Sequence, residues 1–111
     1  MSKRTDQVSE LIKRELSNII VKDFDCPNGV LITITEVDVS IDFENAKVLI
    51  SIYPENVSSK VIKDLDNQIN EFQSMLFKRL KMRIVPKLFF RLDDRLKTAD
   101  EVEKIIEKIH N

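Results

Sequence analysis

Two neighbouring segments in which apolar and polar residues alternate place the strongest constraint on the fold of this chain. In residues 46–53 every second position is apolar: Ala46, Val48, Ile50 and Ile52. In residues 30–41 the alternation changes phase once: Val30, Ile32 and Ile34, then Val37, Val39 and Ile41. Alternation predicts two strands with one buried face each, and the phase change predicts a β-bulge near Thr35 and Glu36. The short polar connection predicts that the strands form an antiparallel hairpin with these apolar residues in the core.

Apolar residues at helical spacing lie on both sides of this hairpin. Residues 5–21 carry one apolar stripe: Val8, Leu11, Ile12, Leu16, Ile19 and Ile20. Residues 61–80 carry another: Val61, Ile62, Leu65, Ile69, Phe72, Leu76 and Leu80. These patterns predict a first helix and then one long helix, or two helices end to end, with Ser58 or Ser59 as the N-cap.

A third strand is expected directly after the second helical region. Pro86 ends that region, because proline does not fit the interior of a helix. The segment "KLFFRL" at 87–92 then predicts a strand with Leu88, Phe90 and Leu92 inward, and the proline at its start favours an edge position.

The chain closes with a predicted helix, for which Thr98 and Glu101 have the spacing of a capping box. The order helix, strand, strand, long helix, strand, helix predicts a single α+β domain over residues 1–111, in which helices pack on one face of a three-stranded sheet.

Several functional classes are excluded by the composition. No apolar run approaches the ~20 residues of a membrane helix, and the first residues lack the apolar core of a signal peptide, so a cytoplasmic protein is expected. Cys26 and His110 are the single cysteine and histidine, which is half of a usual zinc ligand set. Asp93 and Asp94 are adjacent, and neighbouring side chains of an extended segment point in opposite directions. No catalytic residue, metal or cofactor is therefore expected.

The charges are strongly separated along a chain whose net charge is −1. Residues 78–97 hold eight basic and two acidic residues, a net charge of +6, and residues 1–14 have a net charge of +2. Residues 22–66 have a net charge of −5. The basic block spans a helix end, a turn and a strand, so a single solvated helix face explains it poorly. A local patch of this kind attracts a polyanion whatever the net charge, because the field acts within a Debye length of ~8–10 Å.

Aromatic residues are interleaved with this block. Phe72 and Phe90 lie on apolar stripes and are expected in the core. Phe77 and Phe89 fall off the stripes, so they are the better candidates for exposure and for stacking on a base.

Three stretches together resemble bacterial ribosome-binding factor A. These are "VSELIKREL", with Arg4 upstream, the hairpin "PNGVLITITEVDVSIDFENAKVLIS", and "RLKMRIVPKLFFRLD". The second is similar to the family pattern Thr-x-Thr-x-Val-x-Val-Ser-x-Asp…Ala-x-Val, and the third to Arg-Leu-x-x-Arg-x-x-Pro-x-Leu-x-Phe-x-x-Asp. The resemblance covers nearly the whole chain.

This resemblance implies a type II KH-like fold with a kinked central helix and a groove for single-stranded RNA. It implies a non-enzymatic, monomeric factor that binds the immature 30S subunit and its 16S rRNA, assists late maturation and rRNA processing, and matters most in the cold. The residues predicted to bind RNA are Lys3, Arg4, Lys13, Arg14, Lys78, Arg79, Lys81, Arg83 and Arg91.

The predicted kink is where the sequence departs from that family. KH domains use a Gly-rich loop there, and the resembled family has Ala-x-Gly, whereas this chain has Ile69, Asn70 and Glu71. Asn70 or a neighbour is expected to absorb the bend, because Asn tolerates unusual backbone angles better than Ile or Glu. Glu71 adds a negative charge where a phosphate would approach.

The acidic segment and Glu71 keep a second interpretation open. The chain is then a ribosome-associated protein-interaction or hibernation module that contacts the small subunit mainly through protein.

Overall fold

The computed structural model describes residues 3–95 of the chain. Its elements follow the expected order: α1 (Lys3–Asp23), β1 (Leu31–Val39), β2 (Asn45–Tyr53), a 3-10 turn η1 (Glu55–Val57), α2 (Ser58–Asn67), α3 (Ile69–Leu80) and β3 (Lys87–Leu92). The C-terminal helix predicted after Thr98 lies outside the described residues.

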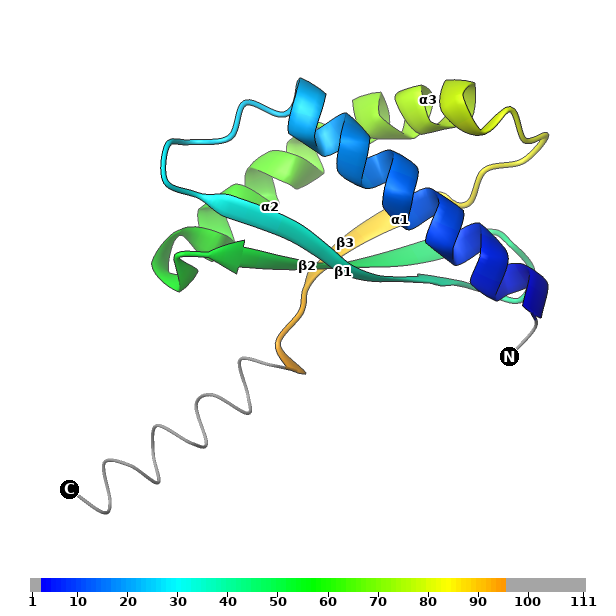
Figure 1. Ribbon diagram of the computed structural model, residues 1–111, viewed down its shortest axis with the longest axis horizontal. Coiled ribbons are helices and arrows are strands. Elements are labelled where there is room, and N and C mark those ends of the chain that lie inside the picture. The colour runs from blue at the N-terminus through cyan, green and yellow to red at the C-terminus, as the bar shows by residue number, and fades with distance from the viewer. Residues whose placement is uncertain (1–2, 96–111) are drawn as a thin grey trace, which may run out of the picture.

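The molecule has two layers, a helical one and a sheet. The sheet has the strand order β1-β2-β3, and the three helices lie together on one side of it (Figure 1). The predicted α+β class and the packing of helices on one face are therefore confirmed. β3 is at the edge, as Pro86 indicated, and it runs parallel to β2.

The core lies between the layers and is built from the predicted stripes. α1 buries Ile12, Leu16 and Ile19 completely, and β2 does the same with Val48 and Ile50. At the centre, the ring of α3's Phe72 meets those of Phe24 and Phe90 edge-on, with ring centroids 6.4 and 6.1 Å apart. Full burial of such side chains is the main source of stability in a domain of this size.

The hairpin has the predicted bulge. β1 and β2 pair antiparallel, and their register shifts between Ile34 and Glu36. The shift keeps Ile34, Val37 and Val39 on the core side, where all three are buried. The prediction for Ile41 was wrong, since its side chain is 85% exposed. β1 ends at Val39, so Ile41 lies in the polar turn and no longer follows the alternation of the strand.

Replacing Ile50 by Ala should lower the free energy of unfolding by ~2–5 kcal/mol, because the vacated space lies at the middle of a close-packed core. Urea unfolding measures this change. Ile41→Ala, which removes the same atoms from an exposed turn, should stay within about 0.5 kcal/mol of the parent. Equal effects at the two positions would contradict the assigned faces.

The second helical region is two helices that meet at Gln68. This residue has φ −106° and ψ 10°, and its N–H donates to Leu65 O at 3.0 Å. The break is thus confirmed, but it lies before the predicted Ile69, Asn70 and Glu71, which form the first turn of α3. No left-handed residue is needed, because a single non-helical ψ at Gln68 turns the chain.

Ser58 and Ser59 do not cap α2 as the sequence suggested. Val57 holds the N-cap position without a side-chain bond. Ser58 is the first helical residue, and its hydroxyl donates backward to Glu55 O at 2.7 Å. The preceding 3-10 turn supplies that carbonyl, so the serine joins the turn to the helix.

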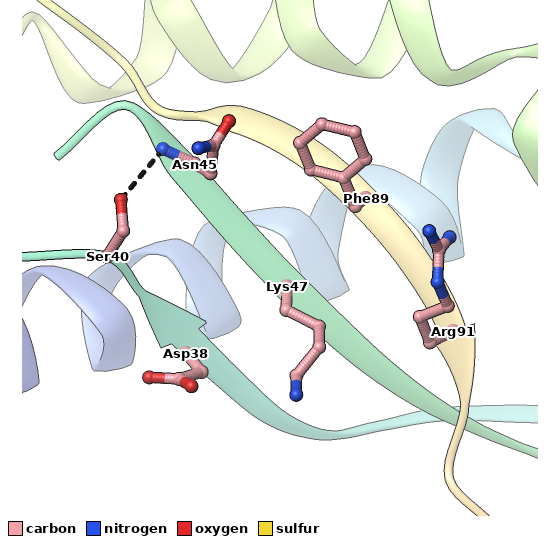
Figure 2. A pocket seen from close by; sticks show the side chains of 6 residues that line it. All are labelled: Asp38, Ser40, Asn45, Lys47, Phe89 and Arg91. Atoms are coloured by element: carbon pink, nitrogen blue, oxygen red, sulfur yellow. Dashed lines mark hydrogen bonds between the residues drawn. The ribbon is translucent and has the colours of Figure 1, made fainter.

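A side chain of α3 fixes the start of β3. The amide of Gln73 donates to Pro86 O at 2.8 Å and accepts from the Leu88 N–H at 2.9 Å. From there Leu88 and Phe90 point into the core, as predicted, and Leu92 is only half-buried. The alternate residues of β3 point to the open side of the sheet, where Figure 2 shows Phe89 and Arg91.

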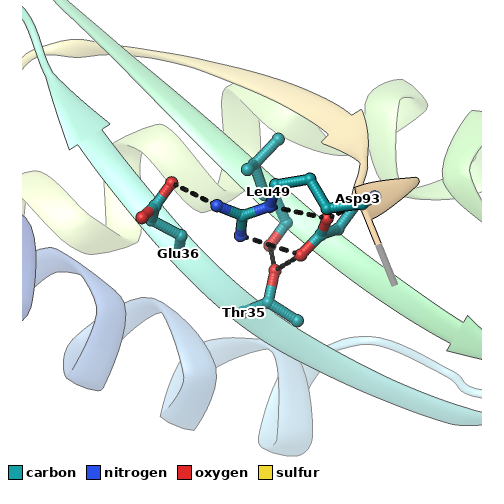
Figure 3. Close-up of polar contacts among 5 residues, drawn as sticks. Thr35, Glu36, Leu49 and Asp93 are labelled. Atoms are coloured by element: carbon teal, nitrogen blue, oxygen red, sulfur yellow. Dashed lines mark hydrogen bonds and ion pairs between the residues drawn. The ribbon is translucent and has the colours of Figure 1, made fainter. Parts of the chain in front are cut away.

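The bulge of β1 is fastened to the end of β3. The Thr35 hydroxyl lies 2.6 Å from Oδ2 of Asp93 and 3.2 Å from Leu49 O (Figure 3). Arg95 contacts the same carboxylate at 3.0 Å and Glu36 at 3.3 Å. These bonds, first that from Arg95 and then that from Thr35, hold the pKa of Asp93 well below its usual range.

Replacing Thr35 by Val should lower the free energy of unfolding by about 1–3 kcal/mol, because it removes a donor from a carboxylate whose side chain is only 3% exposed. The matched control is Thr33→Val, at an exposed position of the same strand. Urea midpoints compare the two, and an equal loss at Thr33 would contradict the role given to Thr35.

The same carboxylate should make stability depend on pH. A lowered pKa means that its contribution is complete above the ordinary Asp value of about 3.9 and is lost as pH falls below that value. The stability difference between the parent and Asp93→Asn should therefore be full near neutral pH and shrink in acid. Urea titrations at both ends of this range measure it, and a constant difference would contradict the lowered pKa.

Candidate nucleic-acid interface

The C-terminal end of α3 and the loop after it carry four of the predicted bases. Lys78 and Arg79 lie in the last helical turn. Lys81 is the C-cap, with φ 52°, and Arg83 follows in the loop. All four are exposed, and the Gln73 bonds to Pro86 and Leu88 hold the far end of the loop.

The structure brings the bases of α1 and α3 together around one acid. Nη1 of Arg79 contacts Glu15 at 3.1 Å, and Nε of Arg14 lies 3.7 Å from the same carboxylate. Lys13 is the half-buried neighbour of Arg14 on α1. This cross-helix pair supports the prediction that these two parts of the sequence share a surface, although one carboxylate offsets part of its charge.

Arg4 and Arg83 lie in a second place, near the N-terminal end of α1. They line one groove together with Val8, Asp42, Phe43, Met82 and Ile84. The guanidinium of Arg4 lies over the Phe43 ring, 5.6 Å from its centroid. Lys3 is the first residue of α1. The helical side of the protein therefore combines bases from α1, α3 and the α3–β3 loop.

Arg91 does not belong to this surface. It alternates with Leu88 and Phe90, which face the helices, so it lies on the opposite side of the sheet. There it borders a shallow groove with Asp38, Ser40, Asn45, Lys47 and Phe89 (Figure 2). The basic block of residues 78–97 is thus divided between two faces, because side chains alternate along β3 and Arg91 points away from the helices.

Lys47 is a residue of this open face that sequence reasoning missed. It lies in the acidic segment 22–66, which hid it in the charge count. The alternation of apolar and polar residues in 46–53 could have identified it, because a residue between the buried Ala46 and Val48 must point away from the core.

The break between α2 and α3 presents a negative charge. Asn70 and Glu71 are exposed and Ile69 is half-buried. Glu71 stands in the first turn of α3, where a carboxylate is favoured by the helix dipole. It thus occupies the position at which the N-terminus of a helix would otherwise attract a phosphate.

The aromatic side chains separate as the stripes predicted. Phe72 and Phe90 are buried, Phe77 is 53% exposed, and Phe89 is half-buried on the open face of the sheet.

Asp93 and Cys26, two of the residues weighed for catalysis or metal binding in the sequence, lie in the described part of the chain. Asp93 is engaged with Thr35 and Arg95, and Cys26 is exposed with its thiol 3.2 Å from Val30 O. No group of three metal-ligating side chains occurs in this part of the chain. None of its helices is both long and apolar enough to cross a membrane.

A small α+β domain with basic side chains on its helical layer and its sheet is typical of proteins that bind nucleic acid. Residues 4–106 match the sequence model of the family Ribosome-binding factor A, and the chain belongs to this family.

Relatives of the same description cover almost the whole chain. The ribosome-binding factor A of Akkermansia muciniphila is 35% identical over 109 residues, which is 98% of this chain and 86% of that protein. The one from Macrococcus caseolyticus is 31% identical over 99% of this chain and 97% of its own length.

Solved structures share the fold. The crystal structure of ribosome-binding factor A from Thermus thermophilus superimposes with a TM-score of 0.70 at 23% identity, covering 79% of this chain and 94% of that one. A Thermus thermophilus homology model, fitted into a cryo-EM map of a 30S–RbfA complex, gives a TM-score of 0.65 at 23% identity, covering 77% and 90%.

Proposed function

We propose that this protein is a non-enzymatic assembly factor that binds the immature 30S subunit through its 16S rRNA and assists late maturation and rRNA processing. The observation that carries the proposal is the family match over residues 4–106. The likeness to the chain fitted into a 30S complex adds support at the level of the fold. The protein acts as a cytoplasmic monomer, without a cofactor, and is needed most in the cold.

The helical side is the primary RNA surface in this proposal. It contains Lys3, Arg4, Lys13, Arg14, Lys78, Arg79, Lys81 and Arg83. α1 and α3 pack against each other, and the ion pair from Arg79 to Glu15 joins them at this surface. Phosphates bound by such bases release counterions, which drives affinity and makes it fall with salt.

The triple change Lys78→Ala, Lys81→Ala and Arg83→Ala should weaken binding to 30S precursors and to 16S rRNA. Arg79 is left in place because its pair with Glu15 joins two helices. The slope of log affinity against log salt should flatten by roughly 0.7–0.9 for each phosphate that the variant no longer binds. The matched control removes Lys22, Lys60 and Lys63, three exposed bases of α1 and α2 that are not among the eight proposed to bind RNA. An unchanged slope in the first variant would refute the RNA surface.

A second candidate function rests on Glu71. Its exposed carboxylate at the start of α3 opposes an RNA phosphate and suits a basic ribosomal protein. In that case the protein contacts the small subunit mainly through protein, as an interaction or hibernation module.

Replacing Glu71 by Gln separates the two functions, because it removes the charge and keeps a good helix former. If RNA lies at the helix break, affinity for 16S rRNA should rise at low salt and the gain should vanish at high salt. Glu44→Gln, in the hairpin turn, is the control for the same change of net charge. Weaker binding to 30S precursors by a folded Glu71→Gln would support the protein contact instead.

A further inference from the structure

The face of the sheet that the helices leave uncovered carries mostly polar and charged side chains around one aromatic ring. Three rows of side chains cross it in register: Ser40, Asn45 and Lys87; Asp38, Lys47 and Phe89; Glu36, Leu49 and Arg91. Six of these residues line the shallow groove of Figure 2. The face is therefore a continuous surface made by all three strands.

Positive charge on this face is concentrated over β2 and β3. Lys47, Lys87 and Arg91 are exposed, and none of them forms an ion pair with another residue of the described chain. Within residues 3–95, the side-chain hydrogen bond of Arg91 is to the neighbouring Phe90 O, at 2.7 Å. β1 carries two acids. Glu36 is paired with Arg95 at 3.3 Å, and Asp38 borders the groove opposite Lys47.

A flat ring lies among these bases. Phe89 is paired with Lys47 across the strands, and the ammonium of Lys87 lies 5.6 Å from the centre of the ring. An aromatic ring on an open sheet, flanked by cations, is the arrangement by which sheet surfaces hold unstacked nucleotides. In the neighbouring row the side-chain amide of Asn45 offers a donor and an acceptor for a base edge, whereas the Ser40 hydroxyl is already bonded to Asp42 at 2.6 Å and to the Asn45 N–H at 3.0 Å.

We propose that this open face is a second RNA site, distinct from the helical side, and that it takes single-stranded RNA. One base stacks on Phe89, while Lys47, Lys87 and Arg91 hold the adjoining phosphates. This inference rests on the proposed RNA-binding function, but it uses other residues. Duplex RNA is disfavoured because its bases are stacked on one another and offer no free face to the ring.

The face continues toward a second ring. Tyr53 is 70% exposed and lies on the same side of β2 as Lys47, six residues further along. At a rise of ~3.3 Å per residue, the two rows are ~20 Å apart. A strand of several nucleotides is thus required to span both rings, which suits an unpaired segment and not a mononucleotide.

The test measures binding of an unstructured RNA of about 10 nucleotides, a usual length for one single-strand-binding domain, and of a duplex of the same length. Lys47→Ala with Arg91→Ala should flatten the salt slope for the single strand by roughly 0.7 for each phosphate no longer bound. Lys60→Ala with Lys63→Ala, an equal loss of charge on α2, should leave the salt slope unchanged.

Phe89→Leu should lower the affinity for the single strand roughly tenfold and keep the salt slope, because it removes stacking and no charge. Phe89→Tyr should restore the affinity.

Amide NMR shifts of the unaltered protein give a readout that needs no variant. Addition of the single strand should move Lys47, Phe89 and Arg91, and shifts confined to α1, α3 and their loop would overturn the second site. Normal RNA affinity in the Lys47/Arg91 and Phe89→Leu variants would overturn it too, as would impaired binding to 30S precursors alone, which indicates a protein contact. Loss of single-strand affinity in the Lys78/Lys81/Arg83 variant alone would sink this site and leave the proposed function standing. Loss in the Lys47/Arg91 variant alone would support this site and count against the helical side as the primary RNA surface. The proposed function itself would fail if the unaltered protein bound neither 16S rRNA nor 30S precursors.

Discussion

The β-bulge after Ile34 is the constraint on which the rest of the structure depends. Side chains alternate along a strand, so without the extra residue Val37 and Val39 would turn to solvent while Ile34 stayed inside. The bulge keeps both halves of β1 against α1 and holds the register with β2. Thr35 and Asp93 fasten it to the end of β3, so the bulge also fixes where the third strand ends.

A sheet held in this way has two unlike faces. One is buried under three helices through residues such as Val48, Ile50 and Phe90. The other stays open and carries Lys47, Phe89 and Arg91. Because the chain crosses from the helical layer to the sheet edge before β3, bases that are close in the sequence end on opposite sides of the molecule. A single basic block in the chain thus becomes two basic surfaces on opposite sides of the sheet.

The chain bends between α2 and α3 without a glycine at the bend. Gln68 breaks the helix with a negative φ, and Phe72 N–H then bonds to Gln68 O at 3.1 Å to start α3. Burial of Leu65 before the break and of Phe72 after it holds both helices on the sheet. Packing of Leu65 and Phe72 against the sheet directs the bend, so glycine is not required. Glu71 occupies the first turn of α3, where a glycine would leave the backbone N–H groups accessible.

Within residues 3–95 the sequence by itself determined the helices and strands, their order and most of the core, because period-2 and period-3.6 burial patterns are local properties of the chain. It also predicted the bulge, the edge position of β3 and the outward placement of Phe77. It misplaced Ile41, since alternation does not tell where a strand stops, and it placed the helix break two residues from Gln68.

Only the tertiary structure decided which bases share a surface. The Arg79–Glu15 pair joins residues 64 apart and the Thr35–Asp93 bond joins residues 58 apart. Contacts at such separations depend on how helices and strands pack, and that is set by the whole core at once.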